Sequence, residues 1–514
     1  MRALSLSPLV CLAVAGCGPL GASPSADGSR VVRGEVLYEA RHATPTGVSA
    51  QIELRPARRV DVALLAGGEV VAEGRTDEAG RFAIEGPARA THVRVYARAR
   101  ADGQDAAVAR DAGGLDTHAM EAPIGAEPLA LRALDARGDA GAFHVVDTML
   151  RGLDAVRAWT GRSLPPVFVY WVRGGTREWS FYRGERPAGS GRFALELLGG
   201  DPGQQSTTDT DEHDEAIILH ELGHFVMDRL TSSSSSGGMH PRGVRVDPGL
   251  AWEEGRASWF AVAVLGEPYY RDTIGVEPWG SLRVDEDLER GEDPTAGLAS
   301  ETTTSRVLWD LSDGEALPDE DRDGVALGPA VVLAAMIAHG EEPGAFPSLP
   351  SFLRHLVAAG RIDEAPLRAM LRATGLPADE LLPADGTVPW PRDLEVGARR
   401  SAKIDGLTQP APSGGPNLPQ VGFDANHTYR VRVTEPGMLT ARLRIVGSGG
   451  AEDRTDLDLE LRDLRAEILA DARGPQPIEA VARFVTPGWY VVRVRDHGDG
   501  NRADYTLEVD LETL

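Results

Sequence analysis

Residues 214–230, in the middle of the chain, read DEAIILHELGHFVMDRL. Within it His220 and His224 stand four residues apart, with Glu221 directly after the first histidine. On a helix, residues four apart lie on one face, so both imidazoles can bind one metal ion while the carboxylate lies beside its bound water. Apolar residues precede and follow this HELGH pentad, which is typical of a helix inside a core. The stretch predicts a buried helix that carries two ligands of a zinc ion.

The third ligand is expected from a second segment, because a catalytic zinc ion takes three protein ligands and keeps one position for water. Residues 248–260 read PGLAWEEGRASWF, and the EGRA of 254–257 resembles the EGxA second motif of the gluzincin metallopeptidases. This resemblance to the thermolysin- and aminopeptidase-like group implies that Glu254 completes the coordination. A buried carboxylate beside two imidazoles would also be costly without an ion to pair with. Glu253 is the alternative ligand.

Three features depart from the gluzincin pattern. Trp252 lies two residues before Glu254, where many members of the group have a tryptophan three residues before that glutamate. The 29 residues between the second histidine and the glutamate make a long gap, which includes the flexible stretch TSSSSSGG over 231–238. Ser258 occupies the position at which thermolysin-like members have an aspartate that orients a histidine. We therefore expect Ser258 or Asp228 to orient that histidine here.

These residue types predict hydrolysis of a peptide bond. Glu221 would take the proton of a zinc-activated water and pass it to the leaving amine. The oxyanion that forms needs a further hydrogen-bond donor. Tyr269 and Tyr270, in the segment GEPYYRD, are candidates for that role, as is His240 in the loop between the two motifs. Packing at the surface is the alternative role for the two tyrosines.

The composition excludes several other classes of protein. The chain has 514 residues, with 53 Lys and Arg against 78 Asp and Glu, and so carries a formal charge of −25. Such an acidic surface repels phosphate backbones, which argues against a nucleic-acid partner. Charged residues make up 25% and hydrophobic residues 42%, an ordinary globular mix, and the length favours several domains. Both cysteines, Cys11 and Cys17, lie near the N-terminus, so the main body has no disulfide and no cysteine nucleophile.

Residues 1–16 have the layout of a secretory signal peptide, with a positive charge at Arg2, an apolar run and then small residues. The tetrad VAGC that ends at Cys17 resembles a bacterial lipobox, which implies cleavage before this cysteine and lipidation of its thiol. Residues 17–30 would then form a tether rich in Gly, Pro and Ser. A signal peptide cleaved near Ala22 is the alternative. We expect an exported protein that is lipid-anchored in the bacterial cell envelope or secreted, with no other contact to the membrane.

Residues 31–122 alternate apolar and polar side chains with a period of two, and turns that contain glycine interrupt them, which predicts a β-sandwich. The segment GRTDEAGRF within this block resembles the TDxxGxF hairpin of carboxypeptidase-regulatory-like domains. Asp77 and Gly80 are expected to shape the turn, and Phe82 to point into the core. Such domains are usually spacers or binding units, so no chemistry is assigned to this block.

Residues 393–514 are also rich in alternating segments. Their order resembles the bacterial pre-peptidase C-terminal (PPC) domain, a β-sandwich appended to secreted peptidases. The matching elements are the DLDLEL that starts at Asp456, the PGWY turn that leads into a strand and the closing ADYTL. Asp456, Asp458 and Asp499 are candidates for calcium ligands, with polar turn residues as the alternative.

Between these blocks, a linker over 123–138 precedes a middle domain over 139–392, in which helical periodicity is mixed with a few strands. Alternation over 190–198 predicts a strand, and in gluzincins an edge strand at this place aligns the substrate backbone. The acidic residues over 209–215 would favour the N-terminus of the HELGH helix through its dipole.

The acidic stretch DEDRDG, later in the middle domain, is a candidate for a different metal. Asp319, Asp321 and Asp323 alternate before a glycine, as aspartates do in calcium loops. An EF-hand would require a glutamate where this chain has Ala330. Calcium binding is therefore one interpretation, and an acidic surface turn is the alternative.

Together these observations predict a multidomain protein in which an α+β zincin-like metallopeptidase core is flanked by two all-β sandwiches. The predicted activity is zinc-dependent hydrolysis of protein or peptide substrates by a lipid-anchored metalloendopeptidase. The alternative is a surface-binding lipoprotein whose peptidase-like domain binds zinc but cleaves nothing. An aminopeptidase is less favoured, because the sequence has no recognisable motif for binding the N-terminus of a substrate.

Overall fold

The computed structural model describes residues 28–101, 103–175, 179–184, 187–204, 208–235, 237–238, 240, 243–274, 282–314, 317, 324–405, 426–447, 456–497 and 502–513. The predicted signal peptide, Cys17 and most of the predicted tether lie outside the described residues. The predicted calcium loop of Asp319, Asp321 and Asp323 lies outside them too, as does Asp499. No helix in the described part of the chain is long and apolar enough to cross a membrane.

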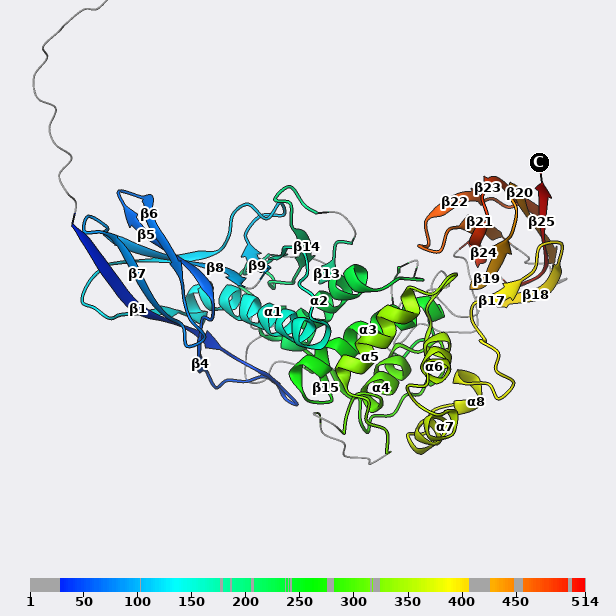
Figure 1. The fold of residues 1–514 in the computed structure, drawn as a ribbon, viewed down its shortest axis with the longest axis horizontal. Helices are drawn as coiled ribbons and strands as arrows, with labels where there is room; N and C mark the ends of the chain where they lie inside the picture. The colour runs from blue at the N-terminus through cyan, green and yellow to red at the C-terminus, as the bar shows by residue number, and fades with distance from the viewer. Residues whose placement is uncertain are drawn as a thin grey trace, which may run out of the picture.

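Three regions follow one another along the molecule: strands, then mostly helices, then strands again (Figure 1). The first region contains β1 (Ser29–Ala40), β2 (Ala43–Thr44), β3 (Gly47–Val48), β4 (Glu53–Pro56), β5 (Val60–Ala66), β6 (Glu69–Arg75), β7 (Arg81–Pro87), β8 (His92–Ala101), β9 (Gln104–Ala109), β10 (Ala119–Pro123) and β11 (Leu129–Ala133). The middle region contains the short helix η1 (Asp135–Arg137), α1 (Asp139–Thr160), β12 (Val167–Tyr170), β13 (Phe181–Tyr182), β14 (Phe193–Glu196), η2 (Asp211–His213), α2 (Glu215–Leu230), α3 (Pro248–Leu265), β15 (Tyr269–Thr273), β16 (Leu282–Asp287), α4 (Glu301–Asp310), α5 (Pro329–Gly340), α6 (Leu349–Ala358), α7 (Glu364–Ala373) and α8 (Ala378–Leu381). The last region contains β17 (Arg392–Leu394), β18 (Arg399–Asp405), β19 (Asn426–Val433), β20 (Gly437–Gly447), β21 (Leu457–Arg462), β22 (Ile468–Ala472), β23 (Ile478–Val485), β24 (Gly488–Asp496) and β25 (Arg502–Thr513).

One sheet runs from the first region into the middle region. Its strand order is β13-β14-β12-β9-β8-β5-β6, and β10 also pairs with β8. The junction is the parallel pairing of β9 with β12, in which Ala106 lies opposite Val167. One hydrophobic core likewise spans both regions, from Val32 in β1 to Trp390. The boundary expected around 123–138 therefore divides neither the sheet nor the core, and this segment contains β11, which pairs in parallel with β1.

The TDxxGxF turn has the expected residues in the expected places, but it does not form a hairpin. Asp77 Oδ1 accepts hydrogen bonds from the backbone N–H groups two and four residues later, at 2.9 and 2.8 Å, and Phe82 is buried. Gly80 has a φ of +74°, and a Cβ there would clash with the carbonyl oxygen of Val36. The flanking strands β6 and β7 pair with β5 and β1 respectively, so the turn carries the chain from one sheet to the other.

Two glycines allow three helices of the middle region to approach closely. A Cβ on Gly223 of α2 would lie 3.1 Å from the Cα of Ala257 in α3. A Cβ on Gly255 of α3 would clash with the side chain of Thr304 in α4. α3 begins at a proline whose preceding residue, Asp247, caps the helix by accepting the N–H of the second helical residue. The side chains of α2, α3 and α4 therefore meet at one place.

One sequence expectation about the surroundings of α2 is corrected. β14 is not an edge strand, because β13 pairs with it along Leu195 and Glu196 while β12 pairs with its other side. Asp214 precedes α2 but does not cap it through its side chain. Its carboxylate instead accepts hydrogen bonds from the N–H and the hydroxyl of Thr273 in β15, both at 2.8 Å. Asp214 therefore joins the start of α2 to β15.

The last region is a sandwich of two sheets, as the alternation predicts. The strand orders are β17-β19-β24-β21-β22 and β18-β25-β20-β23. The two sheets enclose their own core, in which Tyr429, Leu459 and Tyr505 are fully buried. Arg430 joins this sandwich to the middle region by donating a hydrogen bond of 2.6 Å from Nη1 to the carbonyl oxygen of Gly344.

Candidate metal centre

Three side chains converge where α2 packs against α3, and we refer to His220, His224 and Glu254 as the candidate metal centre. The Nε2 atoms of His220 and His224, one turn apart on α2, lie 3.1 Å from each other. The Oε2 atom of Glu254 on α3 lies 3.3 Å from the first of these nitrogens and 3.1 Å from the second. The three atoms form a nearly equilateral triangle.

The triangle has the size that a zinc ion requires. Zinc bonds of about 2.1 Å in a tetrahedron place neighbouring ligand atoms about 3.4 Å apart. The edges of 3.1 to 3.3 Å are close to this value. Two imidazole nitrogens and one carboxylate oxygen are also a donor set of catalytic zinc sites. These residues therefore fit a zinc ion with three protein ligands.

A hydrogen-bond relay orients the first histidine. His220 Nδ1 lies 3.1 Å from Ser258 Oγ, and the serine hydroxyl donates to Glu301 Oε1 at 3.4 Å. The hydroxyl therefore accepts the Nδ1–H, which leaves the lone pair of the ring on Nε2, toward the triangle. Asp228 accepts a hydrogen bond from the Tyr182 hydroxyl at 2.6 Å instead. Of the two expected orienting residues, the structure brings Ser258 to His220.

Glu253 points to a different partner. Its Oε2 lies 2.5 Å from Nη2 of Arg256, whose side chain is almost fully buried. Because the guanidinium neutralises this carboxylate inside the protein, Glu253 is not available to the histidines. The structure brings Glu254, and not the alternative Glu253, to the candidate metal centre.

Burial and charge act in opposite directions on the acid–base groups of the centre. Burial alone would lower the pKa of His224, but the carboxylates of Glu254, Glu221 and Glu253 together more than offset this and raise the pKa to about 9. Burial alone would raise the pKa of Glu254, yet the charges of His224 and His240 hold it well below its ordinary value. Glu221 is also buried and adds negative charge near His224. The centre therefore keeps carboxylate charge inside the protein, where it requires a positive partner.

His240 reaches the centre from the loop between α2 and α3. Its Nε2 lies 3.4 Å from Glu254 Oε2, and its Nδ1 lies 3.2 Å from Glu301 Oε2. Glu301, the first residue of α4, thus contacts both His240 and Ser258. Sequence reasoning gave Glu301 no role, because an acidic residue in the first turn of a helix is explained by the helix dipole alone.

The two tyrosine candidates lie in different surroundings. Tyr270 is buried, and its ring packs edge-on against His220 with the ring centroids 5.8 Å apart. Tyr269 lies beneath the guanidinium of Arg271, which is 4.5 Å from the centre of its ring. Neighbouring residues of a strand point to opposite faces, so the two tyrosines of β15 cannot share one site. The structure brings Tyr270 to the centre and leaves Tyr269 outside it.

Three further groups of side chains among the described residues have the spacing of metal ligands: His339, Glu342 and His355; Asp456, Asp458 and His497; and Asp209, Asp211 and Asp272. The second group contains two of the residues considered for calcium in the C-terminal sandwich. There the carboxylate of Asp458 lies 3.2 Å from His497 Nδ1 and 3.5 Å from Nε of Arg495, whose positive charge neighbours it.

Residues 203–327 match a family model described as the Mycolysin C-terminal domain. The matched stretch contains α2, α3 and α4, and with them His220, His224, Glu254 and Glu301. No curated protein matches the chain.

Several solved structures are similar to part of the chain. The pre-peptidase C-terminal domain of a collagenase from Bacillus anthracis is 12% identical, with 23% of this chain and 93% of that chain covered and a TM-score of 0.18. A mitogen derived from Yersinia pseudotuberculosis is 13% identical, with coverages of 22% and 85% and a TM-score of 0.16. The lysozyme inhibitor PliG from Aeromonas hydrophila is 12% identical, with coverages of 24% and 98% and a TM-score of 0.15. Scores this low carry no argument about the fold.

Proposed function

We propose that this protein is a zinc metalloendopeptidase in which His220, His224 and Glu254 hold the ion. The observation that carries the proposal is the triangle of ligand atoms, whose edges of 3.1 to 3.3 Å fit a tetrahedral zinc ion. The match of residues 203–327 supports it, because mycolysin is a zinc metalloprotease.

The chain itself supplies the general base. When bound, zinc supplies Lewis acidity that makes water more acidic and a peptide carbonyl more electrophilic. Glu221 follows His220 on α2 and is buried beside the second histidine. Its carboxylate takes the proton of the attacking water, holds it and then gives it to the leaving amine. The carboxylate is thus regenerated with each turnover.

His240 is the hydrogen-bond donor that this arrangement favours for the oxyanion. Carboxylates of Glu301 and Glu254 lie 3.2 and 3.4 Å from its two ring nitrogens, so each nitrogen faces a hydrogen-bond acceptor. When both nitrogens are protonated, the Nδ1–H donates to Glu301 and fixes the ring, and the Nε2–H is the group that can stabilise a developing negative charge. Tyr270, whose ring packs against His220, is the second candidate.

The proposed place of action is the bacterial cell envelope. Residues 1–16 would be removed on export, and the thiol of Cys17 would carry the lipid that anchors the protein. Protein or peptide substrates in the same compartment would then reach the centre. A protein without the lipid would be secreted instead.

A surface-binding lipoprotein with a silent zinc domain is the second candidate function. His240 Nε2 lies only 3.4 Å from Glu254 Oε2, so a small displacement would make this imidazole a fourth ligand. Zinc sites with four protein ligands are structural, whereas catalytic sites keep one position open. Glu301 opposes this displacement by binding the other nitrogen of the same ring.

The test compares the full-length protein with its Glu221→Gln variant and with Glu395→Gln, a control at an exposed glutamate of the C-terminal region. Bound zinc and casein cleavage are measured in the same samples. We expect zinc in all three proteins, full cleavage by the control and a rate that falls by about 10²–10⁴ in Glu221→Gln. Zinc without cleavage in the parent would favour the silent domain. A parent without zinc would contradict both functions.

A further inference from the structure

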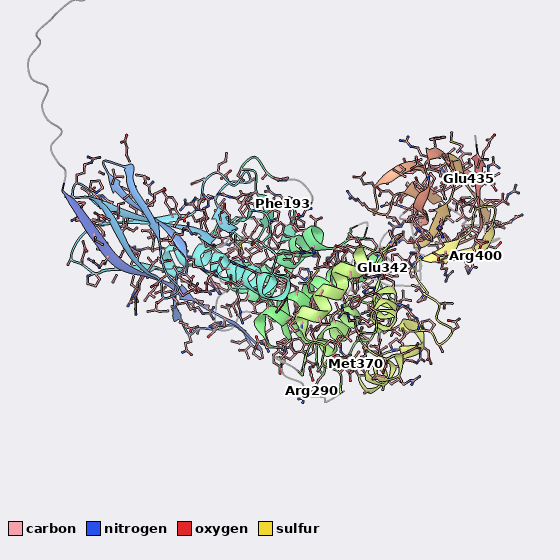
Figure 2. All side chains as sticks on the ribbon, viewed as in Figure 1. Phe193, Arg290, Glu342, Met370, Arg400 and Glu435 are labelled. Carbon is pink, nitrogen blue, oxygen red and sulfur yellow. The ribbon has the colours of Figure 1, made fainter. Side chains whose placement is uncertain are left out.

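A second cluster of imidazole and carboxylate groups lies away from the candidate metal centre. His339 is in the last turn of α5, Glu342 follows that helix, and His355 is on α6. Their potential ligand atoms all lie within 4.8 Å of one another. Phe352 separates the two places, since its ring centroid is 6.4 Å from that of His339 and 5.2 Å from that of Trp252 on α3. Figure 2 shows Glu342 at the end of the helical region nearest the C-terminal strands.

The hydrogen bonds show which ring nitrogens face the carboxylate. Nδ1 of His339 lies 3.2 Å from Glu342 Oε2, and Nδ1 of His355 lies 2.6 Å from Glu342 Oε1. On the other side of the first ring, Nε2 of His339 lies 3.0 Å from Ser351 Oγ. That hydroxyl also lies 3.0 Å from the carbonyl oxygen of Ser348, and a hydroxyl that donates there accepts an Nε2–H from the histidine. In that tautomer the lone pair of His339 is on Nδ1, toward Glu342.

A cation bound among these groups would lie against the Glu342 carboxylate and the Nδ1 atoms of both histidines. Among the described residues, the Glu342 carboxylate makes hydrogen bonds and ion pairs only with the two histidines. The nearby Arg430 is engaged elsewhere, by Asp393 at 2.8 Å and by the carbonyl oxygen of Gly344 at 2.6 Å.

The donor set and its exposure fit zinc. Two imidazole nitrogens and one carboxylate oxygen suit zinc, and a metal-binding histidine has its other nitrogen held by an acceptor, as Ser351 holds that of His339. The side chains of His339 and His355 are 6% and 9% exposed, whereas that of Glu342 is 50% exposed. The carboxylate therefore offers a path from solvent to two buried nitrogens.

We propose that His339, Glu342 and His355 form a second zinc site, which would hold the end of α5 against α6. The site shares no residue with the candidate metal centre, and it does not depend on the proposed peptidase activity. The turn that it would order contacts the C-terminal sandwich directly. Gly344 accepts the hydrogen bond of Arg430, and a Cβ on this glycine would clash with the ring of Trp489.

The test measures zinc bound per chain after equilibrium dialysis of the full-length protein and its variants. Glu342→Gln is the main variant, because its side chain is half exposed and its loss should not unfold the protein. Glu341→Gln is the matched control, since the neighbouring glutamate is also exposed but is not part of the cluster. We expect two zinc ions per chain in the parent and in the control, and one in Glu342→Gln.

His224→Gln isolates the second site by removing a ligand of the first. We expect this variant to keep one zinc ion per chain and to melt at a higher temperature with zinc than with a chelator. Combination with Glu342→Gln should abolish both effects. Equal zinc contents in Glu342→Gln and Glu341→Gln would show that the two histidines only share hydrogen bonds with the carboxylate, and would overturn the proposal. Loss of all zinc from His224→Gln would overturn it too, whereas a parent that cleaves no casein would not.

Discussion

The two β-rich regions have similar sequence patterns but join the helical region in different ways. The first region shares one sheet and one hydrophobic core with it. Arg55 of β4 also reaches Glu215, in the first turn of α2, at 2.6 Å. The last region has a separate core, and of its described residues only Val491 is buried in the larger core.

The difference teaches that alternation identifies strands but not their partners. The pairing of β9 with β12 joins segments about sixty residues apart. Nothing in the sequence of either segment predicts that the other is its partner. A block that resembles a spacer can therefore share its fold with the helical region that follows it. The ion pair of Arg55 with Glu215 places that block next to the helix that carries His220 and His224.

The largest expected effect is from deletion of one region at a time. Removal of 31–133 would expose the edge of β12 that pairs with β9 and would remove about a quarter of the residues of the shared core. We therefore expect an unfolded chain without zinc. Removal of 392–514 would leave that core nearly complete, so we expect a folded protein that still binds zinc. Circular dichroism and zinc content measure both outcomes. If the chain without 31–133 still binds zinc, the first and the last regions are attached to the helical region in the same way, which would contradict the comparison.

A smaller effect is expected from the buried carboxyl of Glu212 in η2. Burial raises the pKa of Glu212 to about 7, from its ordinary 4.5. Between those pH values the folded protein holds a proton that the unfolded chain has released, so the stability falls as the pH rises from about 4.5 to about 7. Glu212→Gln should remove this loss and stabilise the protein at pH 8, by up to about 3 kcal/mol, but not at pH 4. Urea unfolding at both pH values measures this, and an equal effect at both would contradict it.

The smallest effects on stability are expected from the substitution of one arginine at each junction. Arg55 and Glu215 are 22% and 16% exposed, so Arg55→Ala should lower the free energy of unfolding by about 2 kcal/mol. Arg430 pairs with Asp393, which is 60% exposed, and Arg430→Ala should cost about 1 kcal/mol or less. Denaturant unfolding of both variants gives the two values. A larger loss of free energy of unfolding in Arg430→Ala than in Arg55→Ala would contradict the expected difference between the two junctions.

The sequence predicted those parts of the site that local spacing determines. Two histidines four residues apart must share a helix face, and the turn at Asp77 and Gly80 has its residue types in fixed places. The choice between Glu253 and Glu254 rested on a family resemblance, and Arg256 now gives the physical reason for it. Glu301 could not be predicted, because it meets the centre only through the packing of α4 against α3.

The central claim is that Glu254 completes a zinc site that hydrolyses peptide bonds. Its most direct test is the zinc content and casein cleavage of Glu254→Gln beside Glu253→Gln, two neighbouring substitutions with the same change of charge. We predict that Glu254→Gln loses the zinc bound at His220 and His224 together with cleavage, whereas Glu253→Gln keeps both. Cleavage that survives Glu254→Gln, or is lost with zinc only in Glu253→Gln, would contradict the claim.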